Sequence, residues 1–422
     1  MTYFNLNRRF VERESYHENE LMVSEVSGKR LDWSRVLESR ACVVVAPANF
    51  GKTTEMERQA MRLREASQAA VFVALRRLAD LRSFERAIEG DNRKSYQAWK
   101  SSSKGILTIF VDSLDEAAAG KTENIDYLID EILNEVSRAR DRVRWVISTR
   151  PAILTAQVFG KLSAVLGLPA SIKRTATAPS SAVSDTSNSS TASDESTETE
   201  KLRLFSMTQL DINQAKTYLS GRHPQLQADL IVQLARERGL AGFTRSPGGL
   251  DIIASIDLLS NPTDSLTEVF LRVVRAVHVL RTTDHRFEDA GNPPAELLEH
   301  AARKLASASQ VCRLLNIEMP EAKLATPENA LSARLIATPM LPERAVEQLL
   351  ASHLFIDGGF HQVKIYPDEL LPFLAAQRLA GLVESTDQAL RLLQNFTWSS
   401  PSGEQGVQRE YLPLMGWLAT LN

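Results

Sequence analysis

Short apolar runs alternate with amphipathic stretches over the first 170 residues of the chain. Runs of apolar residues, interrupted only by Thr108, Arg144 and Ser148, predict four buried strands, at 41–46, 71–75, 106–111 and 143–148. Apolar residues also recur at spacings of three and four after residue 52 and over 125–139, which predicts helices. Strands that are apolar throughout and separated by helices are typical of a parallel sheet with helices on both faces. The pattern therefore predicts an α/β nucleotide-binding core at 41–170.

The pattern changes abruptly after this core. Residues 171–200 are rich in Ser, Thr and Ala and contain almost no large apolar residue. Such a segment cannot bury enough surface to offset its ordering entropy. We therefore predict a disordered insertion at 171–201.

Helical spacings return beyond the insertion and predict a helical lid domain at 202–262. A helix, a strand, a Gly-containing turn, a strand and a further helix then follow over 345–383, an order typical of a winged helix. We assign 263–400 to a winged-helix domain with preceding helices, and 401–422 to the start of a C-terminal helical segment. The polar residues 1–40 are predicted to form a lead-in beside the ligand.

The first predicted strand runs into a phosphate-binding sequence. Its loop and the following helix start contain Asn49, Phe50, Gly51, Lys52, Thr53 and Thr54. A helix N-terminus presents free N–H groups to a phosphate, Lys52 would reach the β- and γ-phosphates, and the Thr53 hydroxyl would ligate Mg²⁺. Ala46 stands where the Walker A pattern has Gly, and Asn49 is the non-glycine type that best tolerates a left-handed backbone.

Acidic residues follow the third predicted strand, and an arginine follows the fourth. Asp112 lies where a Walker B acid holds Mg²⁺, and Asp115 or Glu116 could orient an attacking water. Arg150 could reach the γ-phosphate. A solvated acidic loop and a surface arginine before a turn remain the alternatives for these residues.

The composition excludes several classes of protein. The chain is 43% hydrophobic and 24% charged with a net charge of −3, which gives no general attraction to nucleic acid or anionic membranes. There is no signal-peptide core and no run of membrane-spanning length. Two cysteines make no disulfide framework and fit a cytoplasmic protein, and seven scattered histidines predict no structural metal.

Taken together, these motifs resemble the NACHT branch of the STAND P-loop NTPases. The resemblance rests on Gly-Lys-Thr-Thr at 51–54, Leu-Asp-Glu at 114–116 and Ser-Thr-Arg-Pro at 148–151, together with Pro247 near a helix start. It covers roughly residues 30–400 and includes a winged helix that ends with Pro-Phe-Leu-Ala-Ala-Gln at 372–377. It implies a slow ATPase that binds ATP or ADP with Mg²⁺ and switches between a closed monomer and a homo-oligomer, as in bacterial antiphage defence.

The resemblance also implies roles for single residues. Lys52, Thr53 and Thr54 would contact phosphates and Mg²⁺, Asp115 and Glu116 would support hydrolysis, and Arg150 would sense the γ-phosphate. Asp112 would hold Mg²⁺ and Pro247 would pack on the adenine. The family usually has a winged-helix His on the ADP phosphate, where this chain has Pro367, so that contact is missing or supplied by another residue.

Two further interpretations stay open at this stage. One is a nucleotide-free scaffold that keeps a degenerate NTPase fold, which Ala46 and Pro367 favour. The other is an AAA+-like remodelling ATPase, against which the winged helix and Leu-Asp-Glu argue. With neither an effector domain before residue 40 nor a repeat array after residue 400, we expect an effector or sensor protein as partner, or a longer protein of which this is the switch. The 370–382 stretch has Arg378 as its single basic residue, which argues against DNA binding.

Overall fold

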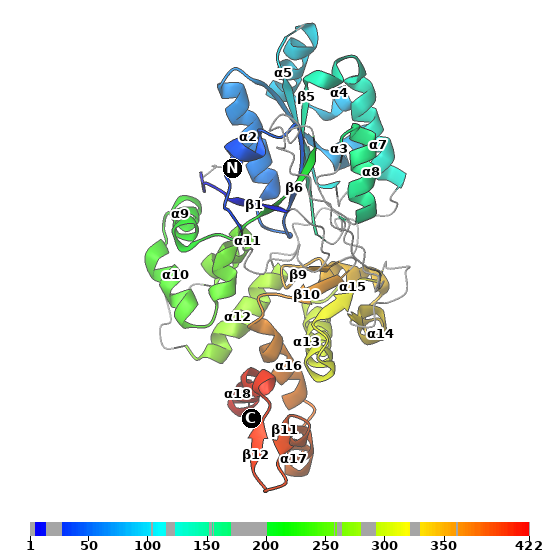
Figure 1. Ribbon diagram of the computed structural model, residues 1–422. Helices are drawn as coiled ribbons and strands as arrows, with labels where there is room; N and C mark the ends of the chain where they lie inside the picture. The colour runs from blue at the N-terminus through cyan, green and yellow to red at the C-terminus, as the bar shows by residue number, and fades with distance from the viewer. Residues whose placement is uncertain are drawn as a thin grey trace, which may run out of the picture. The chain divides into compact units, whose positions relative to one another are not determined.

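The computed structural model divides the chain into two compact units, Tyr3–Gln209 and Leu210–Asn422 (Figure 1). The structure describes residues 5–13, 28–102, 104–114, 123–151, 154, 156–169, 201–256, 258–259, 264–279, 293–320, 330–359 and 362–421. The predicted insertion at 171–200 lies outside these ranges. Among the helices within them, none combines the length and the apolar character that a membrane crossing requires.

The first unit is built on a six-stranded sheet in the order β1-β6-β2-β5-β4-β3. Its strands are β1 (Phe10–Arg13), β2 (Ala41–Val45), β3 (Ala69–Ala74), β4 (Leu107–Asp112), β5 (Val143–Thr149) and β6 (Leu202–Met207). Strands β2 to β6 are parallel and β1 pairs antiparallel with β6. The four predicted strands are confirmed as β2 to β5, and the sheet is mixed but mostly parallel.

Helices cover both faces of this sheet. They are α1 (Trp33–Val36), α2 (Lys52–Glu65), α3 (Leu75–Leu81), α4 (Phe84–Ala87), α5 (Gly90–Ser101), α7 (Glu123–Glu135), η1 (Ser137–Arg142) and α8 (Ala156–Leu166). One core cluster joins alternate residues of β2 to β6, such as Val43 and Ile109, with apolar residues of α3, α4, α5, α7 and α8. The other sheet face carries Phe110 and packs on Trp33 of α1. The arrangement is three-layered, as expected for strands that are apolar on both faces.

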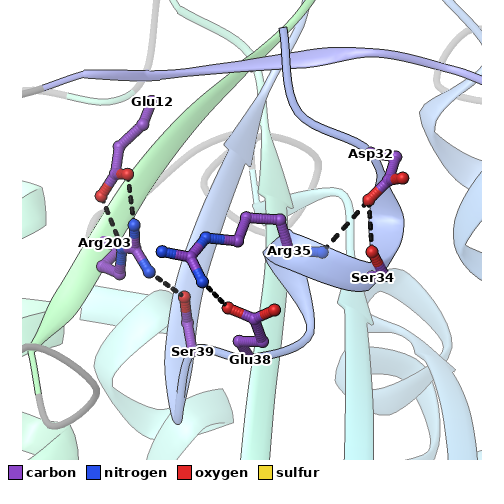
Figure 2. Close-up of polar contacts among 7 residues, drawn as sticks. All are labelled: Glu12, Asp32, Ser34, Arg35, Glu38, Ser39 and Arg203. Carbon is purple, nitrogen blue, oxygen red and sulfur yellow. Dashed lines mark hydrogen bonds and ion pairs between the residues drawn. The ribbon is translucent and has the colours of Figure 1, made fainter. Parts of the chain in front are cut away.

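The sheet continues past residue 201, where the composition had suggested the start of a helical domain. Strand β6 pairs in parallel with β2, Ala41 opposite Leu202. Arg203 of β6 reaches across to the Glu12 carboxylate on β1 with two nitrogens and donates to the Ser39 hydroxyl at 3.3 Å (Figure 2). The described part of the lead-in is likewise built into this unit, because β1 and α1 belong to its core.

The second unit begins with helices. These are α9 (Ile212–Arg222), α10 (Ala228–Glu237), η3 (Ala241–Arg245), α11 (Pro247–Ser255), α12 (Leu266–Val279) and α13 (Ala295–Cys312). Local sequence explains their ends. Asp211 and Gln214 form a reciprocal capping box at the start of α9, and Gly239 follows α10 with φ +70°.

A four-stranded sheet in the order β8-β7-β10-β9 follows in this unit. The remaining elements are β7 (Asn316–Glu318), β8 (Ala330–Ser332), α14 (Ala333–Ala337), α15 (Glu343–Leu350), β9 (Phe355–Gly359), β10 (Gln362–Ile365), α16 (Leu370–Ala380), α17 (Thr386–Gln394), β11 (Thr397–Ser399), β12 (Gln405–Val407), η6 (Arg409–Tyr411) and α18 (Leu412–Leu421). The helix, strand, strand and helix predicted over 345–383 are present as α15, β9, β10 and α16. The two strands do not form an isolated wing, because β10 also pairs with β7.

Candidate functional site

The loop between β2 and α2 has the backbone that a phosphate-binding loop needs. Asn49 and Gly51 both have left-handed conformations, with φ of 64° and 83°. Asn tolerates this region better than other side chains, so the loop forms without a glycine at position 49. Gly51 is the N-cap of α2, and its carbonyl accepts the first helical hydrogen bond, from the Glu55 N–H at 3.0 Å.

Lys52 lies inside the curve of this loop. It is 8% exposed, and its Nζ donates to the carbonyl oxygens of Ala46 at 2.6 Å and Pro47 at 2.9 Å. The Ala46 N–H in turn bonds to the Thr149 carbonyl at the end of β5, at 3.3 Å. The ammonium group is therefore held at the carboxyl edge of the sheet, where ligands bind in open α/β folds.

Asp112 ends β4 at the same edge, and its carboxylate accepts hydrogen bonds from three hydroxyl groups. Thr53 Oγ1 donates to Asp112 Oδ2 at 2.7 Å, Ser148 Oγ to Oδ1 at 2.5 Å and Ser113 Oγ to Oδ2 at 3.1 Å. The carboxylate is only 2% exposed, and a buried charge needs such partners. The structure thus joins the predicted helix start and the predicted acid through one hydrogen bond.

The remaining predicted site residues have different positions. Thr54 is exposed, Phe50 is buried below the loop, and Arg150 is half-buried directly after β5. Asp115 and Glu116 lie outside the described residues. Pro247 is the first residue of α11 in the second unit, where the Ser246 hydroxyl accepts from the Gly249 N–H at 3.1 Å.

Pro367, which stands in place of the family's histidine, packs within the second unit. A Cβ at Gly242 of η3 would lie 2.3 Å from the Pro367 Cβ, so the ring presses directly on this glycine. The neighbouring Tyr366 hydroxyl donates to the Gly242 carbonyl at 2.9 Å. The end of β10 is thereby fixed to the helices of the same unit.

The donors at Asp112 suit a small hard cation. A carboxylate and a hydroxyl are oxygen ligands, and Mg²⁺ is typically held by one or two carboxylates with phosphate oxygens and water completing the shell. These residues therefore fit a Mg²⁺ that arrives with a phosphate ligand. In the described ranges, no group of three or more His, Cys, Asp or Glu side chains could hold a metal ion.

Two contributors to this site were missed at the level of sequence. Ser148 donates to Asp112 and also accepts from the Ser113 N–H at 3.0 Å, so it ties β5 to the end of β4. Trp33 donates from its indole N–H to Glu55 Oε2 of α2, at 3.2 Å. The sequence signal for Ser148 is its place in the Ser-Thr-Arg-Pro motif, in which only Arg150 is assigned a role.

Comparisons with known proteins add little to this geometry. No protein-family model and no curated protein matches the chain. Among solved structures, the chain is similar to the Aeropyrum pernix ORC2 protein, described in ADPNP-ADP complexes, at 10% sequence identity. The TM-score is 0.33, with 92% of this chain and 89% of that chain covered. A likeness at that TM-score carries no argument about fold or function.

Proposed function

We propose that the chain binds ATP or ADP with Mg²⁺ between the β2–α2 loop and Asp112. The observation that supports this most directly is the 2.7 Å hydrogen bond from Thr53 to Asp112, next to the buried ammonium of Lys52. A strand, a loop with left-handed residues and a helix start place backbone N–H groups, a cation and two oxygen ligands at one sheet edge. That combination suits a polyphosphate and its cation.

Each residue then has a defined task. Lys52 would contact the β- and γ-phosphates, and the N–H groups at the start of α2 would bind phosphate oxygens. Thr53 and Asp112 would hold Mg²⁺, which supplies charge neutralisation of the triphosphate. Arg150 follows β5 at the same edge and would respond to the γ-phosphate, while Asp115 or Glu116 would orient water for a slow hydrolysis.

We further propose that nucleotide binding makes the chain a switch of the NACHT type. In that reading ADP favours a closed monomer, ATP favours a homo-oligomer, and an effector or sensor protein completes a cytoplasmic antiphage response. The helices α9 to α11, with Pro247 at the start of α11, and the order α15-β9-β10-α16 are the features of the second unit that support this proposal. The left-handed conformation of Asn49 favours nucleotide binding over a nucleotide-free scaffold, because it gives the loop a backbone suited to phosphate.

Calorimetric titration of the purified chain with ATP and ADP, with and without Mg²⁺, tests the proposal. Lys52→Ala should weaken binding at least about 100-fold, because it removes a charged donor to two phosphates. Lys94→Ala is the matched control, since Lys94 is an exposed lysine of the same unit on α5. Equal nucleotide binding by Lys52→Ala and the wild type would refute the assignment.

A further inference from the structure

Trp33 contacts both of the elements that carry the candidate nucleotide site, β4 and α2. Its ring meets Phe10 of β1 at a centroid distance of 4.7 Å and Phe110 of β4 at 6.3 Å, both edge to face. Its indole N–H donates to the Glu55 carboxylate on α2 at 3.2 Å. One side chain thus contacts the strand that carries Asp112 and the helix that carries Lys52 and Thr53.

Both contacts lie close to the residues that would hold the ligand. Glu55 closes the first turn of α2 through its bond to Gly51, so a shift of Glu55 moves the N-terminal turn of the helix. Phe110 precedes Asp112 by two residues in a strand, which places both side chains on the same sheet face. Displacing Trp33 would therefore alter the spacing between the helix start and the acid.

Trp33 is itself held by the segment before β2. Leu31 and Phe10 exchange backbone hydrogen bonds at 2.8 Å. Asp32 caps α1 by accepting from the Arg35 N–H at 3.3 Å and from the Ser34 hydroxyl at 2.5 Å (Figure 2). These contacts fix the backbone on both sides of a side chain that is only 7% exposed.

We infer that Trp33, through Glu55, is a positioning residue for nucleotide binding, which links residues 28–40 to the affinity of the phosphate site. The inference rests on the proposed function. The Glu55 carboxylate is 4% exposed, and burying its charge near an anionic ligand is tolerable only with donors that hold it in place. The indole N–H is such a donor, and its ring gives the contact a rigid geometry.

The test compares variants that separate positioning from packing. Trp33→Phe keeps an aromatic ring but removes the donor, and we expect the Kd for Mg²⁺-ATP to rise about three- to tenfold. Glu55→Gln keeps an acceptor oxygen and should stay within about twofold of the wild type, whereas Glu55→Leu should match Trp33→Phe. The double variant Trp33→Phe, Glu55→Leu should lose no more than either single change.

Trp99→Phe is the matched control. Trp99 is 5% exposed and also donates its indole N–H, to the Gly105 carbonyl at 3.2 Å, but belongs to the core on the opposite sheet face. We expect it to lower the melting temperature without changing the Kd. An unchanged Kd in both Trp33→Phe and Glu55→Leu overturns the inference. An equal rise in Kd in Glu55→Gln and Glu55→Leu does so as well. A wild-type chain that binds no nucleotide refutes the proposed function instead.

Discussion

Replacing Ser148 by Ala removes the hydroxyl that joins β5 to the buried acid. Ser148 is fully buried, donates to Asp112 Oδ1 at 2.5 Å and accepts from the Ser113 N–H at 3.0 Å. A hydrogen bond to a charged group contributes about 1.5–3 kcal/mol, and an orphaned buried donor costs roughly 1–3 kcal/mol. Because one hydroxyl serves both contacts, the two terms overlap. We expect the free energy of unfolding of the first unit to fall by about 2–4 kcal/mol.

The same change should weaken the cation site. Asp112 would keep its bonds from Thr53 and Ser113 to Oδ2 but lose the donor that fixes Oδ1. A carboxylate held at only one of its oxygens is less well oriented for Mg²⁺, and the loss of a supporting partner typically changes metal affinity by about 10- to 100-fold. We expect ATP binding to require roughly tenfold more Mg²⁺.

Urea unfolding, followed by tryptophan fluorescence, measures the change in the free energy of unfolding of the first unit. Trp398→Phe and Trp417→Phe should be introduced into both the variant and its reference, so that the remaining tryptophans all lie in the first unit. Ser39→Ala is the control, because Ser39 is equally buried but contributes only a 3.3 Å bond from Arg203. Equal losses for Ser148→Ala and Ser39→Ala would show that the hydroxyl at Asp112 has no special role.

Two further predictions concern packing and thiol chemistry. Gly242→Ala should destabilise the second unit by about 1–3 kcal/mol, because its Cβ would meet the rigid Pro367 ring at 2.3 Å. Gly416→Ala is the control: a Cβ at Gly416 would meet no atom within 4 Å, so this change should be neutral or slightly stabilising. Thermal unfolding tests this prediction, and similar changes in melting temperature for Gly242→Ala and Gly416→Ala would contradict it. Burial raises the pKa of the Cys42 thiol to about 12, so the reactive thiolate is scarcely populated at pH 8. Iodoacetamide should add once to the folded chain, at the exposed Cys312, and twice in denaturant; two adducts on the folded chain by mass spectrometry would be the contrary result.

The strands that the sequence predicted, β2 to β5, are short and mostly apolar, and most of their residues are buried. Because both faces of the sheet are covered, these strands form mostly apolar runs, with exceptions such as Arg144 in β5, and the runs can be recognised without knowledge of distant partners. β6 is equally buried, but it follows the polar segment 171–200 and precedes a series of helical spacings, so the sequence places it in the predicted helical lid. Its place in the sheet is set by pairing with β2 and β1, both far away in the chain, and no local pattern carries that information.

The residues of the candidate site also fall into two groups: those that sequence motifs identify and those that only the fold reveals. Lys52, Thr53 and Asp112 belong to motifs that chain order alone can identify, and the structure brings the last two within 2.7 Å. The contacts of Ser148 and Trp33 depend on strand order and packing, which sequence motifs do not show. Ser148 reaches Asp112 because β5 lies beside β4, although the two residues are separated by a helix in the chain.

The hydrogen bonds at the site also imply how nucleotide and cation would depend on each other under the proposed function. Lys52 bonds to two neutral carbonyl oxygens, and exchanging these for charged phosphate oxygens is favourable because charge-assisted bonds are stronger. The Thr53 bond to Asp112 is different, because both oxygens must turn toward Mg²⁺. A triphosphate that arrived without Mg²⁺ would meet an unneutralised buried carboxylate and be repelled by it. Because such coupling is reciprocal, whatever ATP gains in affinity from Mg²⁺, Mg²⁺ must gain equally from ATP.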